Sequence, residues 1–317
     1  MAKRQFQALL ILTALISVTG GASAQTATVQ TETKKSSDNP SSASPAASAS
    51  DPVLVGAGDI ASCDALAGAE ATAKLIDKIP GTVFAAGDLA YPDGSVEDFA
   101  NCYGPTWGRF KDRTRPTPGN HEYHSGGALT YASYFGTAAG DPKKAYYSYE
   151  LGAWHVIALN SECAEVGGCD ASSTQVQWLK QDLAQHSTVC TLAYFHKPLF
   201  SSGAKHGNGP DMKVFWQTLY AADVDVVLNG HDHDYERFAP QDPEGHADML
   251  HGIREFVVGT GGKNTHRTFA APKANSEVRQ ADTYGVLKLT LHASSYDWEF
   301  VPEAGKSFKD SGTGTCH

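Results

Sequence analysis

The sequence is poor in positive charge and has no long hydrophobic run, and each shortage excludes a class of protein. It carries 25 Lys and Arg against 35 Asp and Glu, which gives a formal net charge of −10. Because proteins approach nucleic acids through basic patches, we expect no nucleic-acid binding driven by charge. A small anionic substrate would need local positive charge from metal ions or a few side chains. The apolar run 6–18 is too short for a comfortable membrane-spanning helix.

The first 50 residues do not have the composition of a folded domain. Lys3 and Arg4 precede the apolar run, and the small residues 22–24 fit a cleavage site, so residues 1–24 are predicted to be a signal peptide, with an uncleaved anchor as the alternative. Residues 25–50 are rich in Ser, Ala and Thr and almost lack large apolar groups, which predicts a disordered spacer. We therefore expect one domain, 51–317, in a secreted or periplasmic protein with no membrane span after cleavage.

The cysteines lack the spacing of metal ligands. The chain has 6 of them and no CxxC pair, so we do not assign them to a metal. An even number in an exported chain favours disulfides, although six cysteines allow 15 pairings and free buried thiols are the alternative. Cys163 and Cys169 bracket a short glycine-containing loop and are expected to pair. Cys63–Cys102 and Cys190–Cys316 would then remain.

Apolar runs and helix-like segments alternate along the rest of the chain. Strands are predicted at 53–59, 82–88, 154–160, 191–196 and 225–231, and helices at 64–79, 173–186 and 210–222. The last third has strand patterns at 253–262, 284–293 and 296–302 with fewer helices between them. Repeated strand–helix–strand units predict an α/β fold with a more purely β final third.

Polar residues lie at the ends of five segments, the predicted strands 53–59, 82–88, 191–196 and 225–231 and the segment 114–121. They are Asp59, Asp88, the pair Asn120 and His121, His196, and the pair His231 and His233. In an α/β sheet the strand ends converge on the crevice where ligands bind. A Gly-Asp after a strand is by itself an ordinary turn, and a lone histidine says little. His-x-His on an extended chain, however, places both rings on one side, and the whole set in this order predicts a metal site.

These segments resemble a known family. They read GDIAS (58–62), GDLAY (87–91), GNHEY (119–123), FHKP (195–198) and GHDHDYER (230–237), and the series is similar to the calcineurin-like metallophosphoesterases. The tyrosine of GDLAY and the YER that ends the last motif resemble the purple acid phosphatase branch. The resemblance covers roughly residues 51–270. It implies a four-layer α/β/β/α sandwich, with two mixed sheets flanked by helices and the site at the carboxyl ends of the strands.

The resemblance also implies two metal ions that share a carboxylate. The first would be held by Asp59, Asp88, Tyr91 and His233. The second would be held by Asp88, Asn120, His196 and His231. A phenolate is a hard anionic donor that suits a trivalent ion, so we expect iron at the Tyr91 site and iron, zinc or manganese at the other. Where many relatives carry a histidine in GDxH this chain has Ala61, and Tyr91 supplies the missing donor.

The activity implied is hydrolysis of phosphate monoesters on a small substrate, by in-line attack of a hydroxide that the two metals activate. Within that scheme His121 would stabilise the transition state or act as a general acid, and His206 would bind phosphate unless it is an ordinary surface histidine. A phosphodiesterase or nucleotide hydrolase on the same fold is the alternative, and a non-catalytic metal-bound surface protein is a third. An acid or alkaline optimum and the oligomeric state are left open.

Some features receive simpler interpretations. No room is expected before 58–62 for the additional N-terminal β domain of plant purple acid phosphatases. Glu236 and Arg237 are predicted to form a local ion pair. His124 could touch substrate. The glycine-rich segment 259–264 could hold phosphate through backbone N–H groups, although a lone turn of this kind is weak support.

Overall fold

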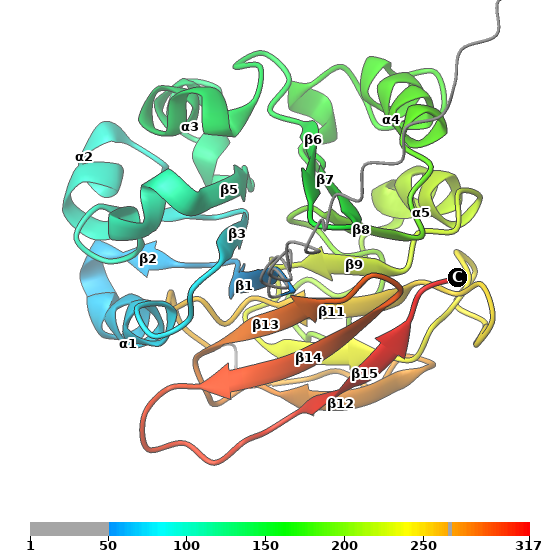
Figure 1. Cartoon of the computed structure of the whole chain (residues 1–317). Helices are drawn as coiled ribbons and strands as arrows, with labels where there is room; N and C mark the ends of the chain where they lie inside the picture. The colour runs from blue at the N-terminus through cyan, green and yellow to red at the C-terminus, as the bar shows by residue number, and fades with distance from the viewer. Residues whose placement is uncertain (1–50, 266–267) are drawn as a thin grey trace, which may run out of the picture. The chain divides into compact units, whose positions relative to one another are not determined.

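The computed structural model describes residues 51–265 and 268–317, so the predicted signal peptide and spacer lie outside the described residues. Two large mixed sheets dominate it (Figure 1). The fold expected from the resemblance, an α/β arrangement of two mixed sheets with flanking helices, is confirmed. Within the described part of the chain, no helix combines the length and the apolar character needed to cross a membrane.

The first sheet has six strands in the order β15-β14-β13-β1-β3-β5. Their bounds are β1 Val53–Ala57, β3 Thr82–Ala86, β5 Thr114–Thr117, β13 Gly285–Leu291, β14 Ser295–Pro302 and β15 Ser311–Thr315. Strands β1, β3 and β5 run parallel, and β13 joins β1 antiparallel. The carboxyl ends of the three parallel strands therefore lie at one edge of the sheet.

The second sheet has seven strands in the order β12-β10-β11-β9-β8-β7-β6. Their bounds are β6 Tyr147–Leu151, β7 Trp154–Ala158, β8 Cys190–Tyr194, β9 Val226–Asn229, β10 Tyr235–Phe238, β11 Arg254–Val258 and β12 Ser276–Gln280. Its central strands β7, β8, β9 and β11 are parallel. Two short strands, β2 Ala61–Ser62 and β4 Ala90–Tyr91, form a separate parallel pair. Along the chain, β2 comes after β1 and β4 comes after β3.

The helices cover the sheets in two groups. Their bounds are α1 Leu66–Ile76, α2 Val96–Asp98, α3 Leu129–Phe135, α4 Thr174–Gln185 and α5 Lys213–Tyr220. In Figure 1, α1, α2 and α3 lie beside the first sheet and α4 and α5 lie beside the second. Ser173 caps the amino end of α4 by accepting a hydrogen bond from the backbone N–H of Val176, as the Ser/Thr start in the sequence predicts.

Alternation along the second sheet's strands shows how the layers pack. Leu192 and Tyr194 of β8 belong to the core shared with the first sheet, which also contains Leu54 and Phe84. The intervening Ala193 belongs to a second core with residues of α4 and α5. A strand that is buried on both faces consists of a continuous apolar run, and for this reason the sequence predicted β8 and β9.

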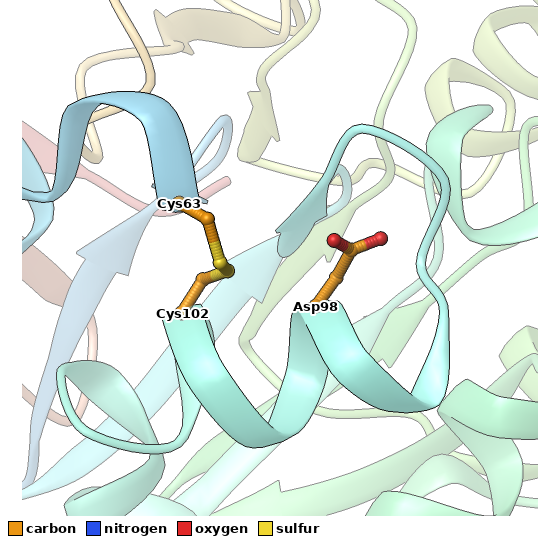
Figure 2. Close-up of side chains that lie close together, drawn as sticks. All are labelled: Cys63, Asp98 and Cys102. Atoms are coloured by element: carbon orange, nitrogen blue, oxygen red, sulfur yellow. A yellow bond between two sulfur atoms is a disulfide. The ribbon is translucent and has the colours of Figure 1, made fainter.

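Three disulfides close loops around this framework. Cys163–Cys169 forms as expected, and the remaining pairs are Cys63–Cys102 and Cys190–Cys316. Figure 2 shows Asp98 one turn before Cys102 on the same helical segment, close to the first of these bridges. The three side chains converge as metal ligands do. Because the sulfurs are bonded to each other, they offer no thiolate, and the cluster is structural.

One local prediction is wrong. Glu236 and Arg237 do not pair with each other, because alternation along β10 sends their side chains in opposite directions. Arg237 contacts Asp310 at 2.7 Å and also pairs with Glu277. Glu236 is buried and accepts hydrogen bonds from Ser202.

Candidate metal centre

Three of the predicted ligands, each two residues after the end of a strand, have an unusual backbone conformation. Asp59, Asp88 and His231 have φ angles of 59°, 51° and 72°, although none of them is glycine. Left-handed backbone at a residue with a side chain is uncommon and is typical of functional sites. This local conformation, which costs free energy, is kept at three separate points of one site.

A buried carboxylate fixes two of the ligand loops to one another. Glu122 accepts hydrogen bonds from the backbone N–H groups of Asp88 at 2.9 Å, Leu89 at 2.8 Å, Ala90 at 3.2 Å and Gly119 at 2.8 Å. It thus ties the 87–91 segment to the 119–123 segment. Sequence reasoning did not single out Glu122, because three of its four partners lie in the 87–91 segment, which only the fold brings close.

Asp59, Tyr91 and His233 form the first donor cluster. The Tyr91 hydroxyl lies 2.9 Å from Asp59 Oδ1, 3.1 Å from Asp88 Oδ2 and 3.3 Å from His233 Nε2. His233 Nε2 is in turn 3.1 Å from Asp59 Oδ1. Donors about 3 Å apart match the edge of a polyhedron whose metal–ligand distances are about 2.1 Å. The set predicted for the first metal therefore converges.

The second donor cluster uses the same oxygen of Asp88. Asp88 Oδ2 lies 3.2 Å from His196 Nε2, and His196 Nε2 lies 3.2 Å from His231 Nδ1. Nearby Asn120 has a buried side-chain oxygen with no hydrogen-bond partner among the described residues. A buried polar atom without a partner is costly and needs an explanation. A metal ion beside Asp88, His196 and His231 would supply the partner, so this donor set also fits a metal.

The outer nitrogens of two histidines are held by hydrogen bonds. His196 Nδ1 lies 2.9 Å from the Ala86 carbonyl oxygen, and His233 Nδ1 lies 2.6 Å from Asn264 Oδ1. Because a carbonyl or amide oxygen can only accept, each Nδ1 carries a proton, and Nε2 is the nitrogen that faces the cluster. Metal-binding histidines are usually oriented in this way.

The charges in the cluster oppose one another. Burial alone would raise the pKa of Asp88, but His196 and His121 outweigh it, and the pKa lies well below its usual range. Burial raises the pKa of the Tyr91 phenol well above its usual value, and Asp59 and Asp88 raise it further. Burial, together with the neighbouring His196 and His206, lowers the pKa of His231 to about 2. The carboxylate of Asp88 is therefore ionised and the His231 imidazole is neutral. Burial alone would lower the pKa of His196, but Asp88 outweighs it and raises that pKa to about 10, so a cation bound here would replace a proton on His196.

A cavity of about 180 Å³ opens above these residues. Its lining consists of Asp88, Tyr91, Pro92, Asn120, His121, Lys205, His206, His231, His233, Lys263 and Asn264. His121 and His206, the two histidines predicted to act in catalysis, both line this cavity. The backbone N–H of His121 donates to Asp88 Oδ1 at 2.9 Å, and its ring Nδ1 contacts the carbonyl oxygen of Pro92. The centre of the His206 ring lies 4.0 Å from the centre of the His231 ring.

The glycine-rich segment 259–264 contributes side chains as well as backbone. Lys263 Nζ donates to Ser62 Oγ at 2.8 Å and lies 4.8 Å from the centre of the Tyr91 ring. Asn264 holds His233, as described above. The sequence drew attention to the glycines of this segment, whereas the residues that reach the site are the two that follow them. His124 is not in the cavity lining and instead lies 3.4 Å from Asp93.

Comparison with known proteins agrees with this geometry. The family model for calcineurin-like phosphoesterases matches residues 54–235. The chain therefore belongs to the calcineurin-like phosphoesterase family.

Its curated relatives include purple acid phosphatases. Purple acid phosphatase 15 of Arabidopsis thaliana is 29% identical over 199 residues, which is 51% of this chain and 37% of the relative. Purple acid phosphatase 18 of the same plant is 27% identical over 239 residues, 66% of this chain and 50% of the relative. This chain thus spans half or less of these two relatives.

Solved structures share the fold. A purple acid phosphatase from yellow lupin (Lupinus luteus) seeds superposes with a TM-score of 0.67 and 22% identity, over 84% of this chain and 54% of that one. GAP50, the anchor in the inner membrane complex of Plasmodium, has a TM-score of 0.64 and 12% identity, over 85% and 90% of the two chains. At these identities the likeness shows the fold alone.

Proposed function

We propose that this chain is an exported phosphatase with a dinuclear metal site that hydrolyses phosphate monoesters. The observation that carries the proposal is that two donor clusters meet at one oxygen, Asp88 Oδ2, which lies 3.1 Å from the Tyr91 hydroxyl and 3.2 Å from His196 Nε2. A shared carboxylate of this kind offsets the repulsion between two cations.

The two metals would take different partners. The first would be held by Asp59, Asp88, Tyr91 and His233. The second would be held by Asp88, Asn120, His196 and His231. The only phenol in the set belongs to the first site, and its high pKa means that a strongly polarising ion is needed to ionise it. We therefore assign iron to the first site and iron, zinc or manganese to the second.

The chain's own residues would position and protonate the substrate. The two metals, when bound, would activate a water and draw charge from the phosphoryl oxygens. His121 Nε2 lies at the cavity, 3.7 Å from Asp88 Oδ2. From this position an imidazole N–H would donate to the departing oxygen or to the transition state. His206, beside His231, would donate to a phosphoryl oxygen.

The lining of the cavity favours a monoester. A phosphate monoester carries one more negative charge than a diester near neutral pH, and Lys205 and Lys263 bring two ammonium groups to a cavity of about 180 Å³. A diester would have to place a second substituent in this small space. The cationic lining therefore supports the smaller and more negative substrate.

Export is supported by the disulfides. Three of them close loops in the domain, and disulfides persist in oxidising compartments outside the cytoplasm. Together with the sequence pattern of residues 1–24, they support a secreted or periplasmic location after removal of a signal peptide.

The test is a pair of initial rates on purified, metal-loaded protein. One substrate is a nitrophenyl phosphate monoester, and the other is the matching diester. We expect the monoester to be strongly preferred, with activity lost on chelation and restored by added metal. Preference for the diester would replace the proposal with a phosphodiesterase, and absence of turnover on both, with two metals bound, would reject a phosphoester hydrolase of these classes.

A further inference from the structure

The segment 201–207 wraps around the side chain of Asp232. Asp232 Oδ2 accepts hydrogen bonds from Ser201 Oγ at 2.6 Å and from the Gly207 backbone N–H at 2.9 Å. Its other oxygen, Oδ1, accepts from the backbone N–H of His206 at 3.2 Å. The carboxyl group is completely buried. One carboxylate thus holds both ends of a loop that carries Lys205 and His206.

The loop fits closely against this carboxylate. A methyl group on Gly203 would lie only 2.2 Å from the Asp232 carboxyl carbon, so only glycine allows the approach. The loop also pairs with residues 269–270, since Gly203 forms a β-bridge with Phe269 and the Ala270 N–H donates to the Ser202 oxygen at 2.8 Å. The loop is therefore held both by Asp232 and by residues 269–270.

Asp232 stands between two of the proposed metal ligands, His231 and His233, but it does not line the cavity. Holding the 201–207 loop to Asp232 therefore holds His206 to the same segment that carries these ligands. In this arrangement the centres of the His206 and His231 rings are 4.0 Å apart.

We propose that Asp232 is the positioning residue for substrate binding: it sets the place of His206 relative to the metal ligands and thereby the affinity for phosphate. This inference rests on the proposed function. A carboxylate suits the task because it accepts from three donors at once. An amide in its place would keep one acceptor oxygen and direct an N–H₂ group at another donor.

The primary test compares Asp232→Asn with the wild-type protein, both loaded with metal. Leaving one buried donor without a partner typically costs enough to weaken an interaction by roughly fivefold or more. We expect KM for the monoester, and the inhibition constant of inorganic phosphate, to rise by about this factor, while kcat changes by less than about twofold. Metal content should stay at the wild-type value, because no ligand has been removed.

A double mutant separates positioning from a general loss of structure. In a His206→Ala background the Asp232→Asn change should add almost nothing to KM, because the group that it positions is gone. Glu236→Gln is the matched control, since Glu236 is also buried and holds Ser202 at the base of the loop, away from His206. It should leave KM unchanged. Ser201→Ala removes one bond to Asp232 and the bond that Ser201 Oγ accepts from the Gly203 N–H, and leaves the other two bonds to Asp232 in place. It should raise KM by a smaller factor and serves if Asp232→Asn does not fold.

The inference is overturned if Asp232→Asn, or Ser201→Ala in its place, leaves KM and phosphate inhibition unchanged. It is also overturned if Asp232→Asn raises KM equally with and without His206, or if its metal content falls. These results presuppose a wild-type protein that turns over a monoester. A wild type without such turnover contradicts the proposed function instead, and phosphate binding measured by calorimetry on the metal-loaded proteins would still compare wild type with Asp232→Asn.

Discussion

Two regions of the chain contribute chemically different halves of the candidate metal centre. The region from β1 to β5 supplies oxygen donors, namely Asp59, Asp88, Tyr91 and Asn120. The region from β8 to β10 supplies imidazoles, namely His196, His231 and His233. Each proposed metal takes ligands from both regions. Neither half is a metal site by itself, and the packing of one sheet against the other creates it.

The two regions also differ in the negative charge that they bring to the site and in the contacts that orient their ligands. The oxygen side contains both carboxylates, and it is fixed internally by Glu122 through four backbone N–H groups. Two of the three imidazoles are oriented by residues that lie outside the region from β8 to β10. His196 is held by the Ala86 carbonyl of β3, and His233 by Asn264. A change to the shared Asp88 on the oxygen side should therefore affect both metals, whereas changes on the imidazole side should affect one metal at a time.

The largest effect is expected from Asp88→Asn, which removes the charge shared by both clusters. We expect kcat/KM on the monoester to fall by at least about 10³-fold, the upper end for losing one electrostatic partner of a transition state. Metal content should fall as well, because two cations would then face each other without the bridging anion. Steady-state rates and elemental analysis measure the two effects. A fully active mutant would end the two-metal account.

The next effect separates the two metals on the imidazole side. His231→Ala should lose the ion that it shares with His196, and His233→Ala should lose the ion beside Tyr91. Each variant should retain one metal per chain and lose about 10²-fold or more in kcat/KM. With iron bound, only His233→Ala should abolish the visible absorption of a phenolate bound to iron. Identical metal losses and spectra for the two variants would contradict the assignment of one histidine to each metal.

A smaller effect is expected from Asn264→Ala, which removes only the outer partner of His233. Loss of such a partner typically costs about 10- to 100-fold in metal affinity or activity. Competition with a chelator should show weaker binding of the first metal and unchanged binding of the second. The matching contact of His196 cannot be removed by a side-chain change, since its partner is the Ala86 backbone. Equal weakening of both metals would argue against Asn264 acting through His233.

The smallest effect is expected away from both regions. A cavity of about 720 Å³, four times the volume of the metal cavity, lies between α4 and α5, with Gln217 and His186 in its lining. Gln217→Ala should change kcat/KM by less than about twofold and stability by less than about 0.5 kcal/mol, as is usual for exposed positions. A large loss of activity would show that volume, and not the donor clusters, marks the functional site.

The central strands and helices could be predicted from the sequence because buried elements are made of recognisable apolar runs. The sequence did not predict the polar edge strands. β12 reads SEVRQ, and β15 reads SGTGT with little burial along its length. Such strands form because a neighbouring strand offers hydrogen bonds, and glycine-rich or charged residues carry little strand preference of their own.

The ligand positions could be predicted because each lies at the end of a strand or within a few residues of it, in a recognisable motif. The supporting residues could not. Glu122, Asp232 and Asn264 act through contacts with loops 25 or more residues away in the chain or through backbone groups. No local pattern encodes those distances. Glu236 and Arg237 illustrate the same limit, because adjacent opposite charges suggested a pair whereas strand alternation separated them.

The central claim is that two metals bind with Asp88 between them. The most direct measurement is the crystal structure of the metal-loaded protein, with anomalous scattering recorded at the absorption edges of iron, zinc and manganese. We predict two peaks, one beside Asp59, Tyr91 and His233 and one beside Asn120, His196 and His231, with Asp88 contacting both and iron at the Tyr91 peak. A single peak, or none, from protein that hydrolyses the monoester would contradict the account.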